Sequence, residues 1–429
     1  MPDPATSTAL SPRKYPPAVT LIRRSTAGPA SAPERCDSDA IEAWLLGPAA
    51  REDDLLALFE SLMWRLVAAG LALDRASLHV GTLHPQVFGF AWNWNRADGG
   101  CDEVRVGEAA LASDAYRRNP LFGVIENGLA FRARTDDPPV AARYPLMAEL
   151  ATQGITEYVA EPLGAGGAAY HNAATIATRR AGGFTDAEVA AIRRLFRVFA
   201  LHVERHIALR IAGNVLDTYL GAAAGRKVLA GAIRRGSGES IRAVVWASDL
   251  RGFTDLADRL SPPDMIAVLN AYFERMAGAV IARDGEVLKF IGDGLLAVFP
   301  LGPDGDVAGP AAAALAAAED ALAAVERLNA DPPAALAAVD GWAPLRSGIA
   351  LHEGEVFFGN VGAPGRLDFT VIGRAVNTAS RVEALSKTLG RPILLTAAVA
   401  RHIDRPMDHL GEHALRGVSG PIAILSPRR

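Results

Sequence analysis

Residues 243–300 constrain the fold most strongly, because they carry a strand pattern, a helix pattern and a hairpin pattern in direct succession. The run from Ala243 to Ala247 is short and apolar and is followed by Asp249, which predicts a buried strand with a carboxylate at its end. Ser261 with Pro262 directly after it is typical of a helix start, and apolar residues then recur at helical spacing. An amphipathic helix is therefore expected after the strand.

The hairpin that follows carries a second carboxylate at its tip. Short strands are predicted at 286–291 and 295–299, and a Gly-Asp-Gly turn joins them. Asp293 is the middle residue of this turn. We expect the strand, helix and hairpin to bring Asp249 and Asp293 within reach of each other.

Two carboxylates on rigid strand ends suit a pair of hard cations such as Mg²⁺. The turn that follows Asp249 opens toward a helix, so its backbone N–H groups suit phosphate oxygens. Together these features predict a nucleoside triphosphate site. Each has an ordinary alternative, because Asp249 alone could cap a helix and Gly-Asp-Gly alone could be a plain turn. The candidate phosphate contacts in the turn are Gly252, Phe253 and Thr254.

Length and composition describe a globular protein of about two or three domains. The chain has 429 residues, of which 50% are hydrophobic and 21% charged, and its net charge of −4 does not favour nucleic acid or an anionic membrane as a partner. Charges or prolines interrupt the apolar runs, and the N-terminus lacks a signal-peptide core. We therefore expect a soluble, cytoplasmic protein, and the two cysteines, Cys36 and Cys101, fit a reducing compartment.

The N-terminal part divides into a tail and a first domain. Residues 1–37 are rich in Pro, Ser, Thr and Ala without periodicity, which predicts a disordered tail. Residues 38–184 alternate helix and strand patterns, which predicts an α+β domain. Its expected elements are helices at 55–66 and 144–153 and strands at 76–80, 88–94, 104–106, 129–132, 158–162 and 173–178.

Scattered residues of this first domain resemble the later part of a GAF-type sensor domain. The resemblance implies a pocket for a small molecule or signal between a sheet and helices, without naming the ligand. The Asn-Lys-x-Phe-Asp-Glu signature by which some GAF domains hold cyclic nucleotides is absent, which disfavours that ligand. The resemblance rests on Asn119-Pro120, Arg132, Tyr144-Pro145, Gly154, Pro162-Leu163, Thr175–Arg179 and Gly183-Phe184-Thr185.

A long helix is predicted next, within a signalling and connector segment at 185–240. Thr185 and Glu188 form a capping box at its start. Apolar residues then follow steps of three and four, which suit the partner helix of a parallel dimer and equally suit packing on the helix's own domain. This stripe consists of Ile192, Phe196, Phe199, Val203, Ile207 and Ile211.

Three histidines are weak candidates for metal or haem ligation. His202 and His206 lie one helical turn apart, but the sequence shows no third ligand. His84 lies beside the Trp-rich strand. Packed or solvated histidines are the commoner explanation for each of them.

The second domain is expected at 241–429. Its order of strands and helices fits an α+β, ferredoxin-like core with added strands. Beyond the first hairpin, we expect a helix at 309–328, a loop at 329–343, a second hairpin of 346–351 and 355–360 around Glu353-Gly354, a strand at 367–372 and a helix at 374–388.

Five motifs of this domain resemble the catalytic domain of class III nucleotide cyclases. They are DLRGFT, EVLKFIGDG, GEVFFGNVG, DFTVIG and VNTASR, and they occur in that family's order. The resemblance implies that Asp249 and Asp293 bind two Mg²⁺ or Mn²⁺ per site, aided by the Leu250 carbonyl. It also implies a homodimer, in which each site takes its metal carboxylates from one protomer and its other residues from the partner.

Further roles follow from the same resemblance. Asn377 orients the ribose, and Arg381, on the same helix face, neutralises charge on the α-phosphoryl group. Arg416 falls where the family places a basic residue for the terminal phosphates. Glu355 stands where some members carry a further arginine, which removes one expected phosphate contact. Asn377 and Arg381 would otherwise be an ordinary polar helix face.

The choice of base is indicated by two positions. Lys289, on the strand face of Val287 and Ile291, matches the family's lysine that contacts an adenine ring acceptor, and Thr370 fills the position of its partner. Guanylate cyclases carry residues such as Glu and Cys there, so the resemblance implies ATP as the substrate and cyclic AMP as the product. A guanylate cyclase and an inactive nucleotide-sensing scaffold remain alternatives; the scaffold predicts loss of a metal or transition-state residue, and none is missing.

Overall fold

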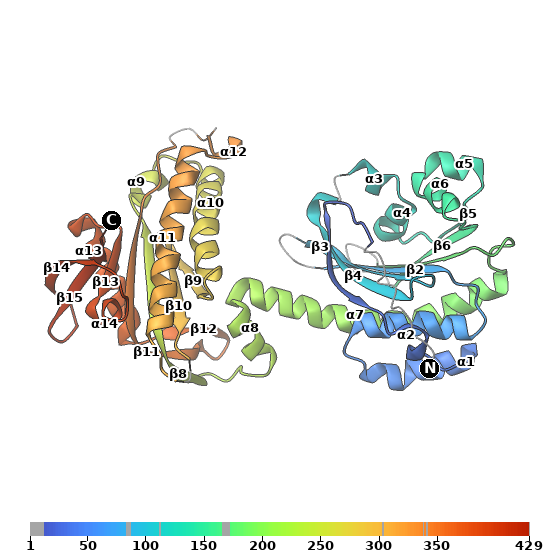
Figure 1. Cartoon of the computed structure of the whole chain (residues 1–429), viewed down its shortest axis with the longest axis horizontal. Coiled ribbons are helices and arrows are strands. Elements are labelled where there is room, and N and C mark those ends of the chain that lie inside the picture. The colour runs from blue at the N-terminus through green and yellow to red at the C-terminus, as the bar shows by residue number, and fades with distance from the viewer. Residues whose placement is uncertain are drawn as a thin grey trace, which may run out of the picture. The chain divides into compact units, whose positions relative to one another are not determined.

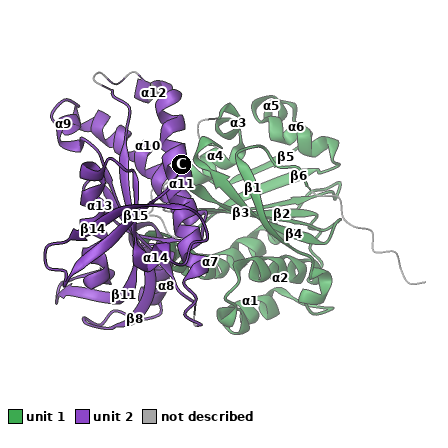
Figure 2. Cartoon of the chain, turned by 60° about the vertical axis from the view of Figure 1, so that its left-hand side comes forward, with its two compact units in different colours: residues 1–215 green, residues 216–429 purple. Residues whose placement is uncertain are grey.

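The computed structural model describes residues 13–82, 87–110, 113–164, 172–302, 304–337, 339 and 342–428. The chain divides into two compact units, residues 1–215 and 216–429, which Figure 2 shows in different colours. Each unit is built on its own sheet, and the helix α7 (Asp186–Leu220) begins in the first unit and ends in the second. The boundary between the two units, after residue 215, falls inside the predicted connector at 185–240.

The first unit contains a seven-stranded antiparallel sheet in the order β1-β4-β3-β2-β7-β6-β5. β3 carries Trp92 and Trp94 on the same face, where both are buried in the core. The strands are β1 (Val19–Ser25), β2 (Arg75–Gly81), β3 (Val87–Asn95), β4 (Gly100–Gly107), β5 (Phe131–Arg134), β6 (Glu157–Leu163) and β7 (Asn172–Thr178).

Helices cover both faces of this sheet (Figure 1). α2 and the first part of α7 pack on one face, around Phe59, Trp94 and Phe199. α4 and α6 pack on the other, around Val124 and Met147. Besides α7, the α-helices are α1 (Ser38–Leu46), α2 (Leu55–Ala68), α3 (Asp114–Arg117), α4 (Pro120–Asn127), α5 (Pro138–Arg143) and α6 (Pro145–Thr152), with short 3₁₀ turns at Gly28–Ser31, Pro48–Arg51 and Glu108–Ala110.

The prediction of a disordered tail at 1–37 is wrong for the part that the structure describes. β1 pairs with β4 as the edge strand of the sheet. Two carboxylates of β4, Asp102 and Glu103, are buried and need cations. Arg24 donates to Asp102 at 2.8 Å and Arg23 donates to Glu103 at 2.7 Å. These long-range ion pairs order the segment, and local composition does not reveal them.

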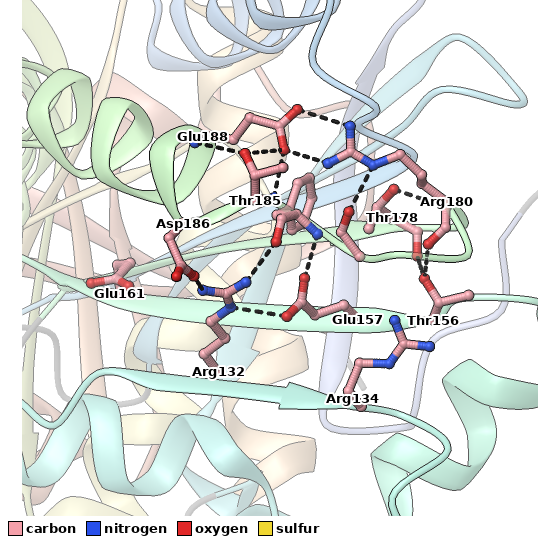
Figure 3. Close-up of polar contacts among 12 residues, drawn as sticks. Arg132, Arg134, Thr156, Glu157, Glu161, Thr178, Arg180, Thr185, Asp186 and Glu188 are labelled. Carbon is pink, nitrogen blue, oxygen red and sulfur yellow. Dashed lines mark hydrogen bonds and ion pairs between the residues drawn. The ribbon is translucent and has the colours of Figure 1, made fainter.

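The start of α7 confirms the predicted capping box (Figure 3). The Thr185 N–H donates to Glu188 at 2.7 Å, and the Glu188 N–H donates to the Thr185 hydroxyl at 3.2 Å. A hydrogen bond from Arg180 lowers the pKa of Glu188 to about 2. Arg132 on β5 also donates to Asp186 at 2.6 Å. The first turn of the helix is thereby attached to the sheet.

The apolar stripe of α7 packs against its own unit. Phe199 and Val203 are 0% exposed, and Phe196 is 3% exposed, in the core shared with α2. The stripe therefore does not form a dimer contact over these residues.

The two candidate histidines of α7 both have hydrogen-bonding partners in the same unit. His202 is 2.7 Å from the Leu45 carbonyl, and His206 is 2.8 Å from the His202 carbonyl. His84 lies outside the described residues.

The second unit contains an eight-stranded sheet in the order β14-β15-β13-β11-β8-β10-β9, with β12 paired to β11. The strands are β8 (Gly238–Leu250), β9 (Glu286–Ile291), β10 (Gly294–Pro300), β11 (Ser347–Ala363), β12 (Arg366–Ile372), β13 (Ile393–Thr396), β14 (Met407–Ala414) and β15 (Pro421–Pro427). The helices wholly within this unit are α8 (Ala222–Leu229), α9 (Phe253–Ala257), α10 (Pro262–Ile281), α11 (Ala308–Ala330), α12 (Ala334–Ala337), α13 (Arg374–Leu389) and α14 (Ala397–Ala400).

The sheet of the second unit is also covered on both faces. α10 and α11 lie side by side on one face, around Trp246, Tyr272 and Phe299. α13 packs on the other, around Phe358 and Ala379. Among the described residues, α11 is a helix long and apolar enough to cross a membrane by length and composition. Its alanines instead pack into the core against α10.

The hairpin predicted around Glu353-Gly354 is wrong. β11 is one continuous strand, and it pairs antiparallel with β8 from Ser347 opposite Leu250 to Gly359 opposite Gly238. A Cβ at Gly354 would lie 2.8 Å from the Ala375 Cβ of α13. The glycine therefore permits close packing of a helix on the strand and does not mark a turn.

Candidate active site

Asp249 lies at the end of the central strand β8, as predicted. Alternate residues of β8 face opposite sides of the sheet, and Val244, Trp246 and Leu250 pack with α10 and α11. Asp249 therefore faces the side covered by α13. The Ser347 hydroxyl donates to the Asp249 carbonyl at 3.0 Å and lies 2.7 Å from the Tyr272 hydroxyl. These contacts fix the strand end that carries the carboxylate.

Asp293 lies in a tight turn beside Asp249. Gly294 pairs with Ile291, so Gly292 and Asp293 form a two-residue loop, and Gly292 has a φ of 62°. A Cβ at Gly294 would lie 2.9 Å from the Ser248 carbonyl oxygen, so a larger residue would push the turn away from β8. Burial, and then the negative charge of Asp249, raise the pKa of Asp293. The structure thus brings the two predicted carboxylates together.

A second charged pair, which sequence reasoning missed, lies in the same region. Arg251 and Glu383 form an ion pair of 3.0 Å. Burial raises the pKa of Glu383 to about 7; Arg251 opposes this shift, and the charges of Asp249 and Asp293 add to it. The signal was available in the sequence, because Glu383 falls on the apolar face of its helix between Val382 and Ser386, which are buried.

Gly348 provides the space for this ion pair. A Cβ at this position would collide with the guanidinium of Arg251 and the Ser386 hydroxyl, and would lie 2.5 Å from the Glu383 carboxylate. Gly348 is paired with Asp249 on β8. The glycine therefore lets a buried ion pair lie directly against the strand pair that carries the first carboxylate.

The balance of charge in this region fits a bound cation. The charge of Asp249 acts on both Asp293 and Glu383, that of Asp293 acts on Glu383, and the Arg251 guanidinium offsets the charge of Glu383. Three carboxylates with one guanidinium leave negative charge in a partly buried place, which is unfavourable unless a cation or protons compensate it. Oxygen ligands of this kind suit Mg²⁺ or Mn²⁺. Asp249 and Asp293 are the residues that would hold the metal.

The candidate phosphate turn has the expected form. Gly252 adopts a left-handed conformation, with a φ of 73°, directly before the short helix α9. The first N–H groups of a helix lack acceptors within the helix. Phe253 and Thr254 begin α9, so their N–H groups are in that position. Phosphate binding here, and a metal contact from the Leu250 carbonyl, remain predictions.

Lys289 forms an ion pair with Asp368 of β12. Thr370 lies two residues further along the same strand, on the same face. Among the described residues, the Lys289 ammonium donates to Asp368 and not to Thr370. The expected grouping with Val287 is wrong, because a bulge shifts the register of β9 between Lys289 and Val287. Val287 packs on the face of α10, whereas Lys289 lies opposite Leu296 on the other face.

The remaining candidates lie on α13 and in a turn beside it. Asn377 is exposed, and Arg381 is half-buried. A Cβ at Gly417 would lie 3.5 Å from the Arg381 guanidinium nitrogens, which places Arg381 against the turn that also carries the exposed Arg416. Within the described part of one chain, no hydrogen bond or ion pair joins these three residues to Asp249 or Asp293. Glu355, the departure from the family pattern, is an exposed residue of β11.

Comparisons with known proteins identify the second unit. Residues 239–422 match the family model described as the adenylate and guanylate cyclase catalytic domain. The adenylate cyclase of Anabaena cylindrica is 34% identical over 174 residues, which cover 41% of this chain and 33% of that protein. This chain thus matches about a third of that relative's length.

Solved structures of both kinds of cyclase also match. The adenylyl cyclase CyaB from P. aeruginosa is 26% identical, with a TM-score of 0.39, covering 45% of this chain and 96% of that one. The guanylyl cyclase Cya2 is 27% identical, with a TM-score of 0.38, covering 44% of this chain and 93% of that one. By the match of the family model and the five motifs in their order, residues 239–422 belong to the class III adenylate and guanylate cyclase catalytic domains.

Proposed function

We propose that this chain is an adenylate cyclase, which converts ATP to 3′,5′-cyclic AMP and pyrophosphate. The observation that carries the proposal is the convergence of Asp249 and Asp293 on adjacent strand ends, where burial and then the charge of Asp249 raise the pKa of Asp293. The adenylate cyclase named among the relatives supports this choice within the family.

In the proposed reaction, the ribose 3′-oxygen attacks the α-phosphorus, and the bond from that phosphorus to the leaving pyrophosphate breaks. Two divalent cations, when bound, would favour ionisation of the 3′-hydroxyl and neutralise the triphosphate. Asp249 and Asp293 would hold these ions, and the N–H groups of Gly252, Phe253 and Thr254 would contact phosphate oxygens. Asn377 orients the ribose, Arg381 stabilises charge on the α-phosphoryl oxygens, and Arg416 contacts the terminal phosphates.

The choice of ATP over GTP rests on Lys289 and Thr370. The Lys289 ammonium is held beside β12 by Asp368, so a donor is fixed on the strand face that also carries Thr370. Adenine N1 accepts a hydrogen bond, whereas guanine presents a donor at that position, so a fixed ammonium favours adenine. A guanylate cyclase is the second candidate, because the family includes both activities.

Exchange of the base-contacting residues tests this choice. The double variant Lys289→Glu with Thr370→Cys should lose ATP turnover far more than GTP turnover. Each mismatched donor or acceptor costs about 1–3 kcal/mol, or roughly five- to 160-fold in the ratio of the two kcat/KM values. Glu355→Gln, an exposed change on β11, is the matched control. Equal losses with ATP and GTP would show that Lys289 and Thr370 do not contact the base.

We further propose a homodimer with two composite sites. Within the described part of one chain, Asn377, Arg381 and Arg416 make no hydrogen bond or ion pair with the carboxylate pair, which supports a site that the partner subunit completes. Mixing Asp293→Ala with Asn377→Ala places both lesions in one site of a mixed dimer and leaves its other site intact. Random exchange of chains should restore about a quarter of wild-type activity. No recovery among chains that demonstrably exchange would contradict the composite site.

The first unit is proposed to regulate this activity as a GAF-like sensor domain in the cytoplasm. Two observations support the proposal. α7 is continuous from the sheet of the first unit to the start of the second, and the described cysteines, Cys36 and Cys101, are unpaired thiols, as in a reducing compartment. Deletion of residues 1–215 should change the turnover of the cyclase domain if the sensor acts on it. Identical turnover with and without that unit would contradict regulation.

A further inference from the structure

The first unit contains a cavity that the cyclase chemistry does not use. Its volume is about 300 Å³, at the small end of the range for ligand pockets. It lies over β2, β3 and β4, beside α4, and part of its wall comes from β1. Most of the wall is apolar, contributed by residues such as Val19, Val80, Phe88, Val104, Val106 and Leu121.

Arg75 provides the positive charge in this wall. It belongs to β2, where Arg75, Ser77 and His79 alternate with the buried core residues Ala76 and Leu78, so the three polar side chains share the cavity face. Among the described residues, no carboxylate lies within ion-pair distance of Arg75, although nearby arginines such as Arg24 and Arg132 each have one. Among the described residues that line the cavity, none is Asp or Glu. A guanidinium in a largely apolar wall without a counter-ion favours an anion.

The other polar groups of the wall are neutral. His79 is 2.8 Å from the Ser77 hydroxyl, which in turn lies 2.6 Å from the Thr175 hydroxyl. Burial, and then the charge of Arg75, lower the pKa of His79 to about 4, so it is uncharged at neutral pH. The Asn119 side-chain oxygen accepts from the Leu121 N–H at 2.9 Å, which leaves its amide nitrogen as a donor. The wall thus offers one full positive charge and several neutral hydrogen-bonding groups.

A single positive charge in a small apolar wall matches a singly charged anion. A phosphate group carries close to two charges at neutral pH and requires more compensation than Arg75 provides. A carboxylate carries one charge and matches the planar fork of a guanidinium. The volume equals that of about ten water molecules, which limits the ligand to a small molecule.

We propose that this cavity binds a small molecule with one carboxylate on an apolar body, with Arg75 as the contact of the carboxylate. Val104, Val106 and Leu121 surround the apolar part. The proposal concerns the first unit alone and does not depend on which cyclic nucleotide the second unit makes.

Two probes of equal shape and different charge test the proposal on the full chain. Indole-3-acetate carries a carboxylate, and indole-3-acetamide is its neutral counterpart. Isothermal titration calorimetry should show at least ten-fold tighter binding of the acetate. Arg75→Gln should weaken acetate binding at least ten-fold and change amide binding less than two-fold, whereas Arg96→Gln, an exposed change outside the cavity, should alter neither.

A second variant locates the binding in the cavity. Val106→Phe fills space in the wall without changing a charge, so it should weaken binding of both probes. A thermal melt shows whether Arg75→Gln is folded. If it is not, Val106→Phe and the ratio of acetate to amide affinity in the wild-type protein decide the outcome. Equal affinity for acetate and amide, no saturable binding of either at millimolar concentration, or acetate binding unchanged in a folded Arg75→Gln or Val106→Phe protein would overturn the proposal.

Discussion

Arg251 and Glu383 form a partly buried ion pair beside the two carboxylates that are proposed to hold metal. Arg251 follows Asp249 by two residues, and Glu383 comes from α13, which also carries Asn377 and Arg381. The pair therefore connects the strand that provides the first carboxylate to the helix that carries the proposed ribose and phosphate contacts. Its geometry depends on the absence of a side chain at Gly348.

We expect Gly348→Ala to destabilise the second unit by about 1–3 kcal/mol, because the new methyl group would overlap the Arg251–Glu383 pair. Gly365→Ala is the matched control, since a Cβ there meets no atom within 4 Å. Urea unfolding of both variants measures the difference. Equal free energies of unfolding would show that the ion pair can move aside without loss.

The raised pKa of Glu383 predicts a specific dependence of stability on pH. The folded state binds the proton more tightly than the unfolded state, whose pKa is near 4.5, so this contribution is present at low pH and is lost as pH rises from about 4.5 to about 7. Its size is on the order of 3 kcal/mol in the metal-free protein. Glu383→Gln should remove this slope from the free energy of unfolding, and Glu355→Gln should retain it. The same slope in both variants would contradict the assignment.

Divalent metal should stabilise the wild-type protein and leave Asp293→Asn unaffected. Mn²⁺ at a hundred times its dissociation constant adds about 2.7 kcal/mol to the free energy of unfolding. The variant should melt at the wild-type temperature or slightly higher without metal, because it removes the repulsion between Asp293 and Asp249. Melting curves with and without Mn²⁺ measure both effects. A full metal-induced shift in Asp293→Asn would exclude that carboxylate as a ligand.

The packing of α7 predicts that truncating two of its residues to alanine lowers stability by different amounts. Phe199→Ala should destabilise the first unit by about 3–5 kcal/mol, because the ring is 0% exposed. Leu209→Ala, at a position that is 57% exposed, should change stability by less than about 0.5 kcal/mol. Thermal unfolding of the two variants compares them directly. Similarly small losses of stability in both variants would indicate that Phe199 forms a dimer contact and not a core contact.

Local signals were sufficient to predict the helix starts and the two carboxylates. Ser261 caps α10 as expected, and Thr185 and Glu188 cap α7, because these contacts form between residues three apart. Asp249 lies at the end of an apolar strand, and Asp293 lies in a two-residue hairpin turn, so both are marked by local sequence. The role of Gly354 was not predictable locally, since it depends on Ala375 of α13 packing against it.

Long-range contacts account for the other differences. The Arg251–Glu383 pair and the ion pairs of β1 join residues far apart in sequence, so spacing alone does not reveal them. The bulge in β9 moves Val287 to the opposite face from Lys289, and strict alternation cannot predict it. The stripe of α7 fits a partner helix and its own core equally well, and only the packed structure distinguishes the two.

The product formed from a mixture of nucleotides tests the central claim most directly. The purified full chain would be incubated with equal concentrations of ATP and GTP and with Mn²⁺, and both cyclic products would be measured by mass spectrometry. The account predicts 3′,5′-cyclic AMP in at least ten-fold excess over cyclic GMP, and neither product from a folded Asp293→Ala protein. Cyclic GMP in excess, or undiminished cyclic AMP from Asp293→Ala, would contradict it.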